Sequence, residues 1–493
     1  MFLLPVITTI VVCLVVFSKS VERAKVTSTD IAIAVYLLYA LFNLIFIREI
    51  TPDIFMLLGW GMYLCLYIAA RNITNKYPIV WFIIGIGTIQ ALIGIAQLCG
   101  WIPSNHQDFP VTGTFPNPGP YGGFLAVSLI ATTWMLRAET RQKVLLWMAL
   151  LLVLGMLIVS NSRAAWVAVF VGIVTQLPVI RKRWTKITLL FAVCALVGGL
   201  YFYRPASADA RILIWNVCAR LIENHPVTGV GVGTLPLYYM NAQAEFFANN
   251  PNSELSVVAN NNYQAFNEFI HLCVEQGMIG LLLLLSVIFT CCKSSCFPII
   301  LTWSMFAMFS YPADLPLFMI VFVLSISLCS SGREIISFKF NKKWLLCSLV
   351  IIPLIVMMNL KYHKAIQNIG VSAIAEFPNN REYMLRFAKQ KQDVIIFEKL
   401  TKNICSSTDI LCDMGDAYKI CHEIKRADSC YSLARQMVPC RIIPLHKLYL
   451  LYKQTDSTRA KVYATQILDF KFRVVGSAVL RARADAKKYL NYE

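Results

Sequence analysis

Charge is scarce in this sequence. Asp, Glu, Lys and Arg together make up 15% of the 493 residues, while hydrophobic residues make up 57%. Soluble chains carry about 25% charged residues, so this composition, with a mean hydropathy of +0.61, excludes an ordinary soluble globule. Apolar runs of about 16 to 25 residues recur over the first 360 positions, and each is long enough to cross a bilayer core of roughly 30 Å. We therefore predict an all-α, polytopic helical membrane protein.

Acidic residues are scarcer than basic residues. The sequence has 27 Asp and Glu against 45 Lys and Arg, which gives a net charge of +18. In a soluble protein this excess would favour nucleic acid as a partner. Here the basic residues lie mostly in short loops and in the tail, so membrane topology, membrane lipids and phosphate groups explain them, and no nucleic-acid partner is expected. No cleavable signal is expected at residues 2–17, because they have neither a basic N-region nor a small-residue cleavage site.

The apolar runs of residues 1–360 give twelve candidate membrane spans. They lie at roughly 2–17, 28–47, 52–70, 78–99, 121–136, 144–160, 164–180, 187–203, 266–290, 297–311, 315–331 and 344–360. Lys and Arg are divided unequally between the alternating loops: one set holds 17 and the other holds five. Because cytoplasmic loops carry the excess of Lys and Arg, we place the richer set in the cytoplasm.

This orientation brings three polar stretches to the non-cytoplasmic face. They are the loop 100–120, the turn 161–163 and the long excursion 204–265, which is the one polar stretch with room for a site. The tail, following a twelfth span, is expected on the same face. We therefore predict that the functional site lies at this face, built around residues 204–265.

Residues 361–493 change character and predict a separate helical domain, with 23 Lys and Arg against 13 Asp and Glu. Small, aromatic and proline residues fall at the positions typical of a tetratricopeptide-type helix pair: Gly415, Tyr418, Ala427, Tyr431, Ala434 and Pro439. A looser pair is predicted at about 444–470. The alternative is an irregular helical tail.

No metal pattern is found among the 16 cysteines. Cys291, Cys292 and Cys296 cluster at a predicted helix end, but no His or second Cys pair completes a zinc site, so we expect no metal. Five cysteines lie in the tail, at 405, 412, 421, 430 and 440. If the tail is exported, one or two disulfides among them are expected.

Arginines are the first candidates for chemistry. Arg163 stands where a span begins at the outer face, and Arg211 lies in the long excursion. A guanidinium forms bidentate hydrogen bonds with phosphate oxygens, so we interpret both arginines as anion ligands. The alternative for Arg163 is an arginine that snorkels to the membrane interface, and the alternative for Arg211 is a solvated surface charge. Arg220, and His225 in the glycine-rich stretch HPVTGVGVG (225–233), are supporting candidates, although His225 could equally end a helix.

A second group of polar residues opens the predicted span at 266–290. Asn267, Glu268, His271 and Glu275 fall on neighbouring stripes of one helix. Ionisable residues at membrane depth are costly and commonly functional. We therefore take Glu268 and His271 as candidates for acid–base chemistry, with Asn267 and Glu275 in support. A structural histidine is the alternative.

Six ordered motifs over about residues 110–320 resemble the O-antigen ligase and Wzy-type polymerase superfamily. They are GTFPNPGPYGGFLA (113–126), SRAAW (162–166), RILIW (211–215), ENHPVTGVGVGT (223–234), NEFIHLCVEQGMIGL (267–281) and YPADLPLF (311–318). The tail is similar to the helical-repeat ends of some members. In this superfamily a glycan passes from an undecaprenyl-pyrophosphate carrier to a hydroxyl acceptor, without metal or cofactor.

The resemblance implies a multi-pass protein of the bacterial inner (cytoplasmic) membrane, with its active site facing the periplasm. It also implies that the two pyrophosphate-binding arginines are Arg163 and Arg211. The family usually has a histidine immediately before the Asn of the fifth motif, where this sequence has Phe266. Either Glu268 or His271 substitutes for it as the base, or the acceptor chemistry differs.

Four functions remain open at this level. The preferred one is inverting transfer of O-antigen or another surface polysaccharide to lipid A-core. The alternatives are a polymerase, with a carrier-linked glycan as acceptor, and a protein O-oligosaccharyltransferase, with the tail as docking module. A transporter that binds an anionic substrate through the same arginines is a different class, disfavoured because no inverted repeat is evident.

Overall fold

The computed structural model describes residues 7–8, 23–50, 54–73, 75–138, 141–177, 205–329, 334–339, 380–470 and 476–490, with a few single positions within 188–199 and 357–367. The protein is an all-α polytopic membrane protein. Nine predicted spans fall on helices; those at 2–17, 187–203 and 344–360 lie almost wholly outside the described residues.

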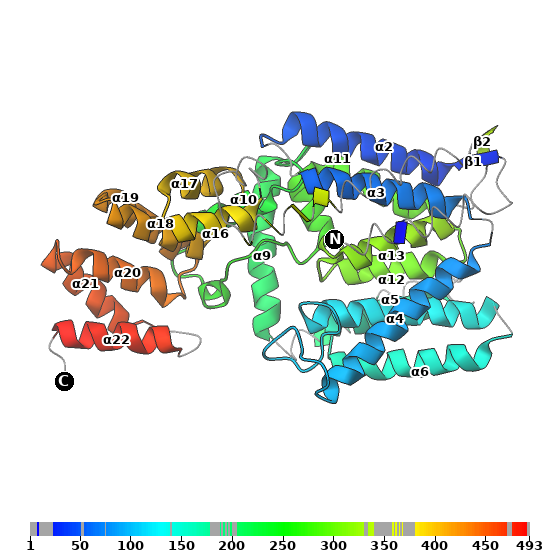
Figure 1. Ribbon diagram of the computed structural model, residues 1–493, viewed down its shortest axis with the longest axis horizontal. Coiled ribbons are helices and arrows are strands. Elements are labelled where there is room, and N and C mark those ends of the chain that lie inside the picture. The colour runs from blue at the N-terminus through cyan, green and yellow to red at the C-terminus, as the bar shows by residue number, and fades with distance from the viewer. Residues whose placement is uncertain are drawn as a thin grey trace.

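The membrane helices lie side by side, most of them along the long axis of the molecule (Figure 1). They are α2 (Ser28–Phe42), continued by η1 (Asn43–Ile47), α3 (Ile54–Arg71), α4 (Tyr77–Leu98), α5 (Pro118–Ala138), α6 (Lys143–Ser160), α7 (Arg163–Thr175), α11 (Glu268–Thr290), α12 (Phe297–Ala307) and α13 (Pro316–Cys329). Four are long and apolar enough to cross a membrane: Ser28–Ile47, Tyr77–Leu98, Lys143–Ser160 and Glu268–Thr290. The others are shorter apolar helices.

Helix α5 forms the centre of this bundle, in contact with α4, α6, α7 and α12. Every residue from Pro120 to Thr132 is buried. Small residues let the neighbours come close, since a Cβ at Gly123 would lie 2.3 Å from the ring of Phe306. That ring stacks on Phe318, with centroids 5.4 Å apart. The close packing fixes where the ends of these helices, and the loops on them, must lie.

The excursion 204–265 is largely helical. It forms α9 (Pro205–Asn224), α10 (Leu235–Asn249) and the 3-10 turn η3 (Glu254–Val258). Helix α9 runs across the ends of the membrane helices, roughly perpendicular to them (Figure 1). Its buried residues recur with helical spacing, from Leu213 to Leu221. One side of α9 is therefore packed, and the residues between these positions remain available to a site.

The glycine-rich stretch packs against a kink in α11. At Gly277 the backbone leaves the helix, with φ 65° and ψ −168°. Main-chain hydrogen bonds join the two segments: the Gly231 amide donates to Glu275 and the Met278 amide donates to Pro226, both over 2.9 Å. A Cβ at Gly277 would lie 2.1 Å from the Val227 oxygen, so only glycine fits this contact.

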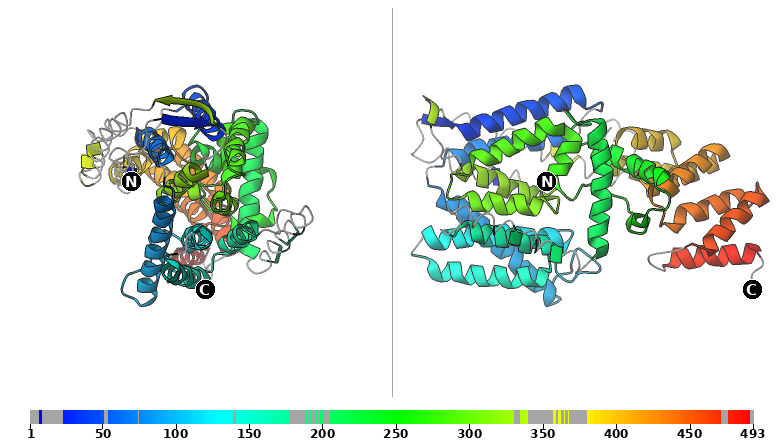
Figure 2. Two further views of the ribbon diagram at one scale, coloured as in Figure 1. Left: turned by 90° about the vertical axis from the view of Figure 1, so that its right-hand side faces the viewer. Right: turned by 180° about the vertical axis from the view of Figure 1, so that it is seen from behind.

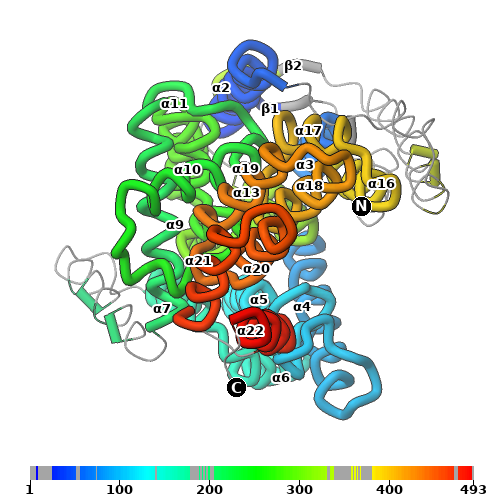
Figure 3. The backbone as a smooth tube through the Cα atoms, turned by 90° about the vertical axis from the view of Figure 1, so that its left-hand side faces the viewer, coloured from blue at the N-terminus to red at the C-terminus, as the bar shows by residue number. Residues whose placement is uncertain are grey.

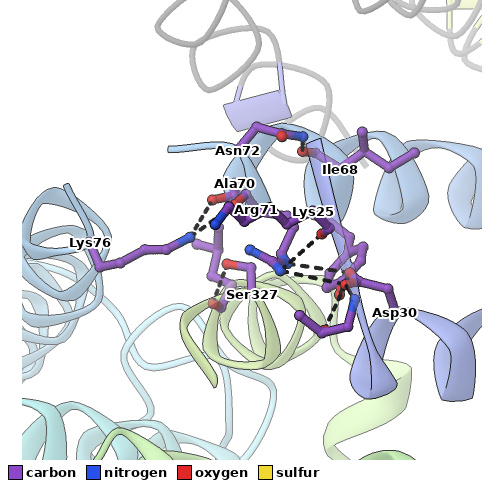
Figure 4. A network of polar contacts seen from close by, with 11 residues as sticks. Lys25, Asp30, Ile68, Ala70, Arg71, Asn72, Lys76 and Ser327 are labelled. Carbon is purple, nitrogen blue, oxygen red and sulfur yellow. Dashed lines mark hydrogen bonds and ion pairs between the residues drawn. The ribbon is translucent and has the colours of Figure 1, made fainter. Parts of the chain in front are cut away.

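At the opposite end of the bundle, a small antiparallel sheet pairs β1 (Arg23–Thr27) with β2 (Glu334–Lys339). The sequence had suggested only loops here. Asp30 fastens the sheet to the bundle by accepting hydrogen bonds from the Thr27 amide (2.7 Å) and the Tyr67 hydroxyl (2.6 Å), and it forms an ion pair with Arg71 (3.3 Å). Arg71 and Lys76 meet at the end of α3, where the Lys76 ammonium donates to the Ala70 and Arg71 oxygens (Figure 4).

The tail forms paired helices. They are α16 (Arg381–Lys391), α17 (Val394–Asn403), α18 (Thr408–Ile420), α19 (Ile424–Met437), α20 (Ile442–Tyr452), α21 (Ser457–Leu468) and α22 (Ser477–Leu490). Gly415 lets α18 and α19 approach, because a Cβ there would lie 2.4 Å from the Tyr431 ring. Helix α19 ends at Met437, two residues before Pro439. The expected disulfides are not formed: the five tail cysteines are free thiols.

These tail helices lie at the end of the bundle that α9 crosses, away from the β1–β2 sheet (Figures 2 and 3). They dock on α10 and on the chain after it. The Gln243 amide donates to the Met437 oxygen over 2.6 Å, and Arg381 lies 3.7 Å over the ring of Tyr263. The tail therefore shares an end of the molecule with the polar loops.

Candidate functional site

Two cavities lie where the loops meet the bundle. The first, here called the arginine cavity, has a volume of about 530 Å³. All three stretches that the charge bias places on one face contribute to it: residues 109–111, 160–163 and 207–215, together with parts of α5, α7 and the end of α12. Both Arg163 and Arg211 line this cavity, and no Asp or Glu is among its lining residues.

A tight turn presents Arg163. Helix α6 ends at Ser160, Asn161 takes a left-handed conformation (φ 51°), and α7 starts at Arg163. Asn tolerates this conformation better than most residues. The turn is fastened to α5 by the Ser162 hydroxyl, which donates to the Gly119 oxygen over 3.2 Å. The guanidinium is thereby placed at the first turn of α7, at the cavity wall.

Arg211 reaches the same cavity from α9. One terminal nitrogen donates to the Ser207 oxygen (3.0 Å) and hydroxyl (2.9 Å), and the other reaches the Phe309 oxygen at 3.5 Å. Its Nε is buried without a hydrogen-bond partner in the described part of the chain. Burial lowers the pKa of the Arg211 guanidinium, and the positive charge of Arg163 lowers it further. The two guanidinium groups are therefore close enough to repel one another.

The second cavity, here called the acidic cavity, has a volume of about 570 Å³ and lies between α2, α3, α11 and α13. Glu268, His271 and Glu275 line it, as does Asp314. The His271 Nε2 lies 3.1 Å from Glu275 and its Nδ1 lies 3.9 Å from Glu268. One Glu268 oxygen also accepts a hydrogen bond from the Ala313 amide over 2.8 Å.

Two supporting candidates have structural contacts instead. Glu275 accepts hydrogen bonds from the Gly233 (2.7 Å) and Leu235 (3.1 Å) amides, at the start of α10. The Asn267 side chain accepts from the Phe269 and Ile270 amides and caps α11. Both residues hold the loop and helix that carry the site.

Arg220 and His225 are not brought to either cavity. Arg220 lies 5.0 Å from the ring of Phe246 on the far part of α9. His225 is exposed just beyond the end of that helix, and its backbone oxygen accepts from the Gly229 amide. The glycine-rich stretch acts through its fit to the α11 kink rather than through His225.

Phe266 is a site residue that residue-type reasoning passes over. Its ring lies 5.7 Å from the Arg211 guanidinium and makes an edge contact with Tyr311 at 5.3 Å. It therefore stands beside the arginine cavity, while Glu268, two residues further on, lines the acidic cavity. Its position just before Asn267 is the one signal that pointed to it.

In the described ranges, no group of three or more His, Cys, Asp or Glu side chains is arranged to hold a metal ion. The buried cluster around His271 is held together by its own ion pair and by backbone amides.

A comparison with protein-family models finds a match within the chain. Residues 148–285 match the model of the O-antigen ligase family, a family of glycan transfer or polymerisation in polysaccharide synthesis. The matched range contains Arg163, Arg211 and the segment from Phe266 to Glu275. No curated protein matches the chain. The family match confirms, over residues 148–285, the resemblance predicted from the motifs.

Proposed function

We propose that this protein transfers a glycan from an undecaprenyl-pyrophosphate carrier to a hydroxyl acceptor at the periplasmic face of the bacterial inner membrane. The reaction inverts the anomeric carbon and uses no metal, and the preferred function is ligation of a surface polysaccharide such as O-antigen. The observation that carries the proposal is the placement of Arg163 and Arg211 in one cavity.

Two like charges in one partly buried cavity repel each other, and a bound dianion relieves this repulsion. A diphosphate offers several oxygens to two guanidinium groups, each of which forms paired hydrogen bonds. The buried Nε of Arg211 supplies a further donor. Apolar residues on the same walls, among them Val167, Ile212 and Phe306, suit the first units of a polyprenyl chain.

The reaction needs a leaving group and a base. The acceptor oxygen attacks the anomeric carbon, the bond from that carbon to the phosphate oxygen breaks, and undecaprenyl diphosphate leaves with the electron pair. Arg163 and Arg211 stabilise the charge that develops on the diphosphate. The acceptor proton passes to a carboxylate. Glu268 fits this role better than His271, because the His271 Nε2 is already paired with Glu275 at 3.1 Å, whereas the second Glu268 oxygen lies 3.9 Å from His271 Nδ1, its nearest basic atom.

Replacing either arginine by alanine tests the diphosphate role. With purified protein and lipid-linked glycan, we expect Arg163→Ala and Arg211→Ala each to lower the rate of transfer by about 10²–10³-fold. Arg220→Ala, on the same helix as Arg211 but outside both cavities, is the matched control and should transfer glycan at the normal rate. Normal transfer by both cavity variants would refute the proposal.

The same assay tests the base. Glu268→Gln keeps the oxygen that accepts from the Ala313 amide but cannot take a proton, so we expect transfer to fall strongly while the protein stays folded. An unchanged rate would remove Glu268 from the mechanism. Movement of the glycan across the membrane without formation of a new glycosidic bond would favour a transporter instead.

Gene disruption separates the acceptors. A ligase leaves lipopolysaccharide core uncapped when it is lost, a polymerase leaves core capped by a single repeat, and a protein transferase leaves proteins unglycosylated. We expect uncapped core.

A further inference from the structure

The acidic cavity has a charge pattern opposite to that of the arginine cavity. Three carboxylates line it, from Glu268, Glu275 and Asp314, against one imidazole, from His271. Its lining residues include no Lys and no Arg. Negative charge beside largely apolar walls is costly unless a cation joins it. The cavity is therefore unsuited to a phosphate and suited to a positively charged group.

Glu275 is already fully engaged, by two backbone amides and by His271. Glu268 is not: one oxygen accepts from the Ala313 amide, while the other has its nearest basic atom, the His271 Nδ1, at 3.9 Å, beyond hydrogen-bond distance. Asp314 is exposed beside it. Two carboxylates therefore remain with capacity to accept from a ligand.

Gln276 provides an independent indication of a missing donor. It lines the acidic cavity and is only 4% exposed. Its Nε2 reaches the Tyr36 hydroxyl at 3.4 Å, but its Oε1 is buried without a partner among the described residues. Buried polar atoms in native proteins are nearly always hydrogen-bonded. The Gln276 oxygen is therefore an unused hydrogen-bond acceptor in a cavity lined by carboxylate oxygens, which are also hydrogen-bond acceptors. A ligand that suits this cavity must carry hydrogen-bond donors.

The remaining walls are apolar and aromatic. Trp60 and Tyr63 of α3 and Trp303 of α12 line the cavity, which continues along α13 through residues such as Val323 and Ile326. Aromatic faces attract ammonium groups, and the aliphatic part suits a hydrocarbon chain. Polar residues at one end and apolar walls at the other match an amphiphile better than a free sugar or a metal ion.

We propose that the acidic cavity is a second ligand site, which binds an amphiphile with a protonated amine on its polar head and a hydrocarbon chain. This site is next to the proposed donor site, because Phe266, whose ring lies 5.7 Å from the Arg211 guanidinium, precedes Glu268 by two residues. The two neighbouring cavities therefore differ in the charge of the ligand that each one suits.

Photolabelling of the full-length protein in phosphatidylcholine nanodiscs tests the site. The probe is a twelve-carbon primary amine with a diazirine on its chain, and the reference probe is the alcohol of the same length. We expect the amine to label peptides of α3 and α13 about tenfold more than the alcohol does, and unlabelled dodecylamine to compete. Equal labelling by the two probes would overturn the proposal.

Glu268→Gln removes one charge without changing shape, and should reduce amine labelling about tenfold while leaving alcohol labelling unchanged. The matched control is Glu254→Gln, which alters an exposed carboxylate outside the cavity and should label as the unmodified protein does. Amine labelling unaffected by Glu268→Gln would also overturn the proposal.

Arg211→Ala separates the two proposals: it should retain amine labelling while losing transfer. If the unmodified protein were labelled by the amine but transferred no glycan, the function would be refuted and the site would stand.

Discussion

At the scale of single residues, Phe266 is the most unusual part of the site. It adopts φ 51°, a left-handed conformation that costs a bulky residue about 1–2 kcal/mol. Its surroundings hold it there: the ring makes an edge contact with Tyr311, whose hydroxyl accepts from the Asn117 amide over 2.8 Å. The strain places an aromatic face beside Arg211, at the position where the family usually has a histidine.

We predict that Phe266→Leu slows glycan transfer about two- to thirtyfold. Leucine leaves the backbone conformation as it is but removes the ring that faces the Arg211 guanidinium, an interaction worth about 0.5–2 kcal/mol. Initial rates with lipid-linked glycan measure the effect. Phe246→Leu is the matched control, since Phe246 faces Arg220 on the same helix, outside both cavities. Equal rates for the two variants would show that the Phe266 ring has no part in the site.

The shared placement of two site candidates could be predicted from the sequence, because it follows from membrane topology. Arg163 and Arg211 are far apart in the chain, yet the uneven distribution of Lys and Arg places their loops on one face, and both line one cavity. Contacts that depend on tertiary packing could not be predicted. Glu275 is predicted as a supporting residue of the acid–base pair, but its carboxylate accepts hydrogen bonds from the Gly233 and Leu235 amides. This contact depends on how a distant loop folds back onto α11.

At the scale of elements, the kink of α11 and the glycine-rich stretch form one unit. Gly229 packs against the backbone of the α11 kink, and Gly277 packs against the backbone of the glycine-rich stretch. A Cβ on either glycine would lie within 2.5 Å of backbone atoms of the other segment. This pairing places Glu275 at the start of α10. It also fixes the first turns of α11, on which Glu268 and His271 line the acidic cavity. Hydropathy predicted the span at 266–290 but not the kink, because a glycine inside an apolar run has no local signal of its backbone conformation.

We predict that Gly277→Ala destabilises the protein by more than about 1 kcal/mol. Alanine strongly disfavours this backbone conformation, and its methyl group would collide with the Val227 oxygen. Thermal unfolding in detergent measures the loss as a lower midpoint. Gly155→Ala is the control, because Gly155 lies inside α6 with open space around it, and it should leave the midpoint unchanged or raise it. A normal midpoint for Gly277→Ala would contradict the described packing.

At the scale of the whole molecule, the bundle has two different ends. One carries the β1–β2 sheet and the ion pair between Asp30 and Arg71; the other carries α9 and the tail (Figure 1). The charge bias predicted that the polar loops and the tail share an end. The docking of the tail could not be predicted, because it depends on single side chains such as Gln243 and Asn261 meeting backbone and side-chain groups over 140 residues away.

One small network at this junction lends itself to a test. The Arg441 guanidinium donates to Asp409 (2.8 Å), to the Thr408 hydroxyl (2.9 Å) and to the Asn260 side chain (2.9 Å). The Asn261 side chain donates to Asp409 over 2.8 Å as well. Arg441 therefore ties the chain after α10 to α18, and through it the tail to the segment that leads into Phe266.

We predict that Arg441→Ala loosens this junction without unfolding the bundle. Losing the charged donor should cost about 1–2 kcal/mol locally, which corresponds to amide hydrogen exchange about 5–30-fold faster at residues 259–263 and 407–411. The control is Arg426→Ala, an exposed arginine whose ion pair with Glu423 lies within the tail; such surface pairs contribute little, so exchange at the junction should not change. Equal exchange in the two variants would mean that other contacts, such as Gln243 with Met437, hold the tail in place.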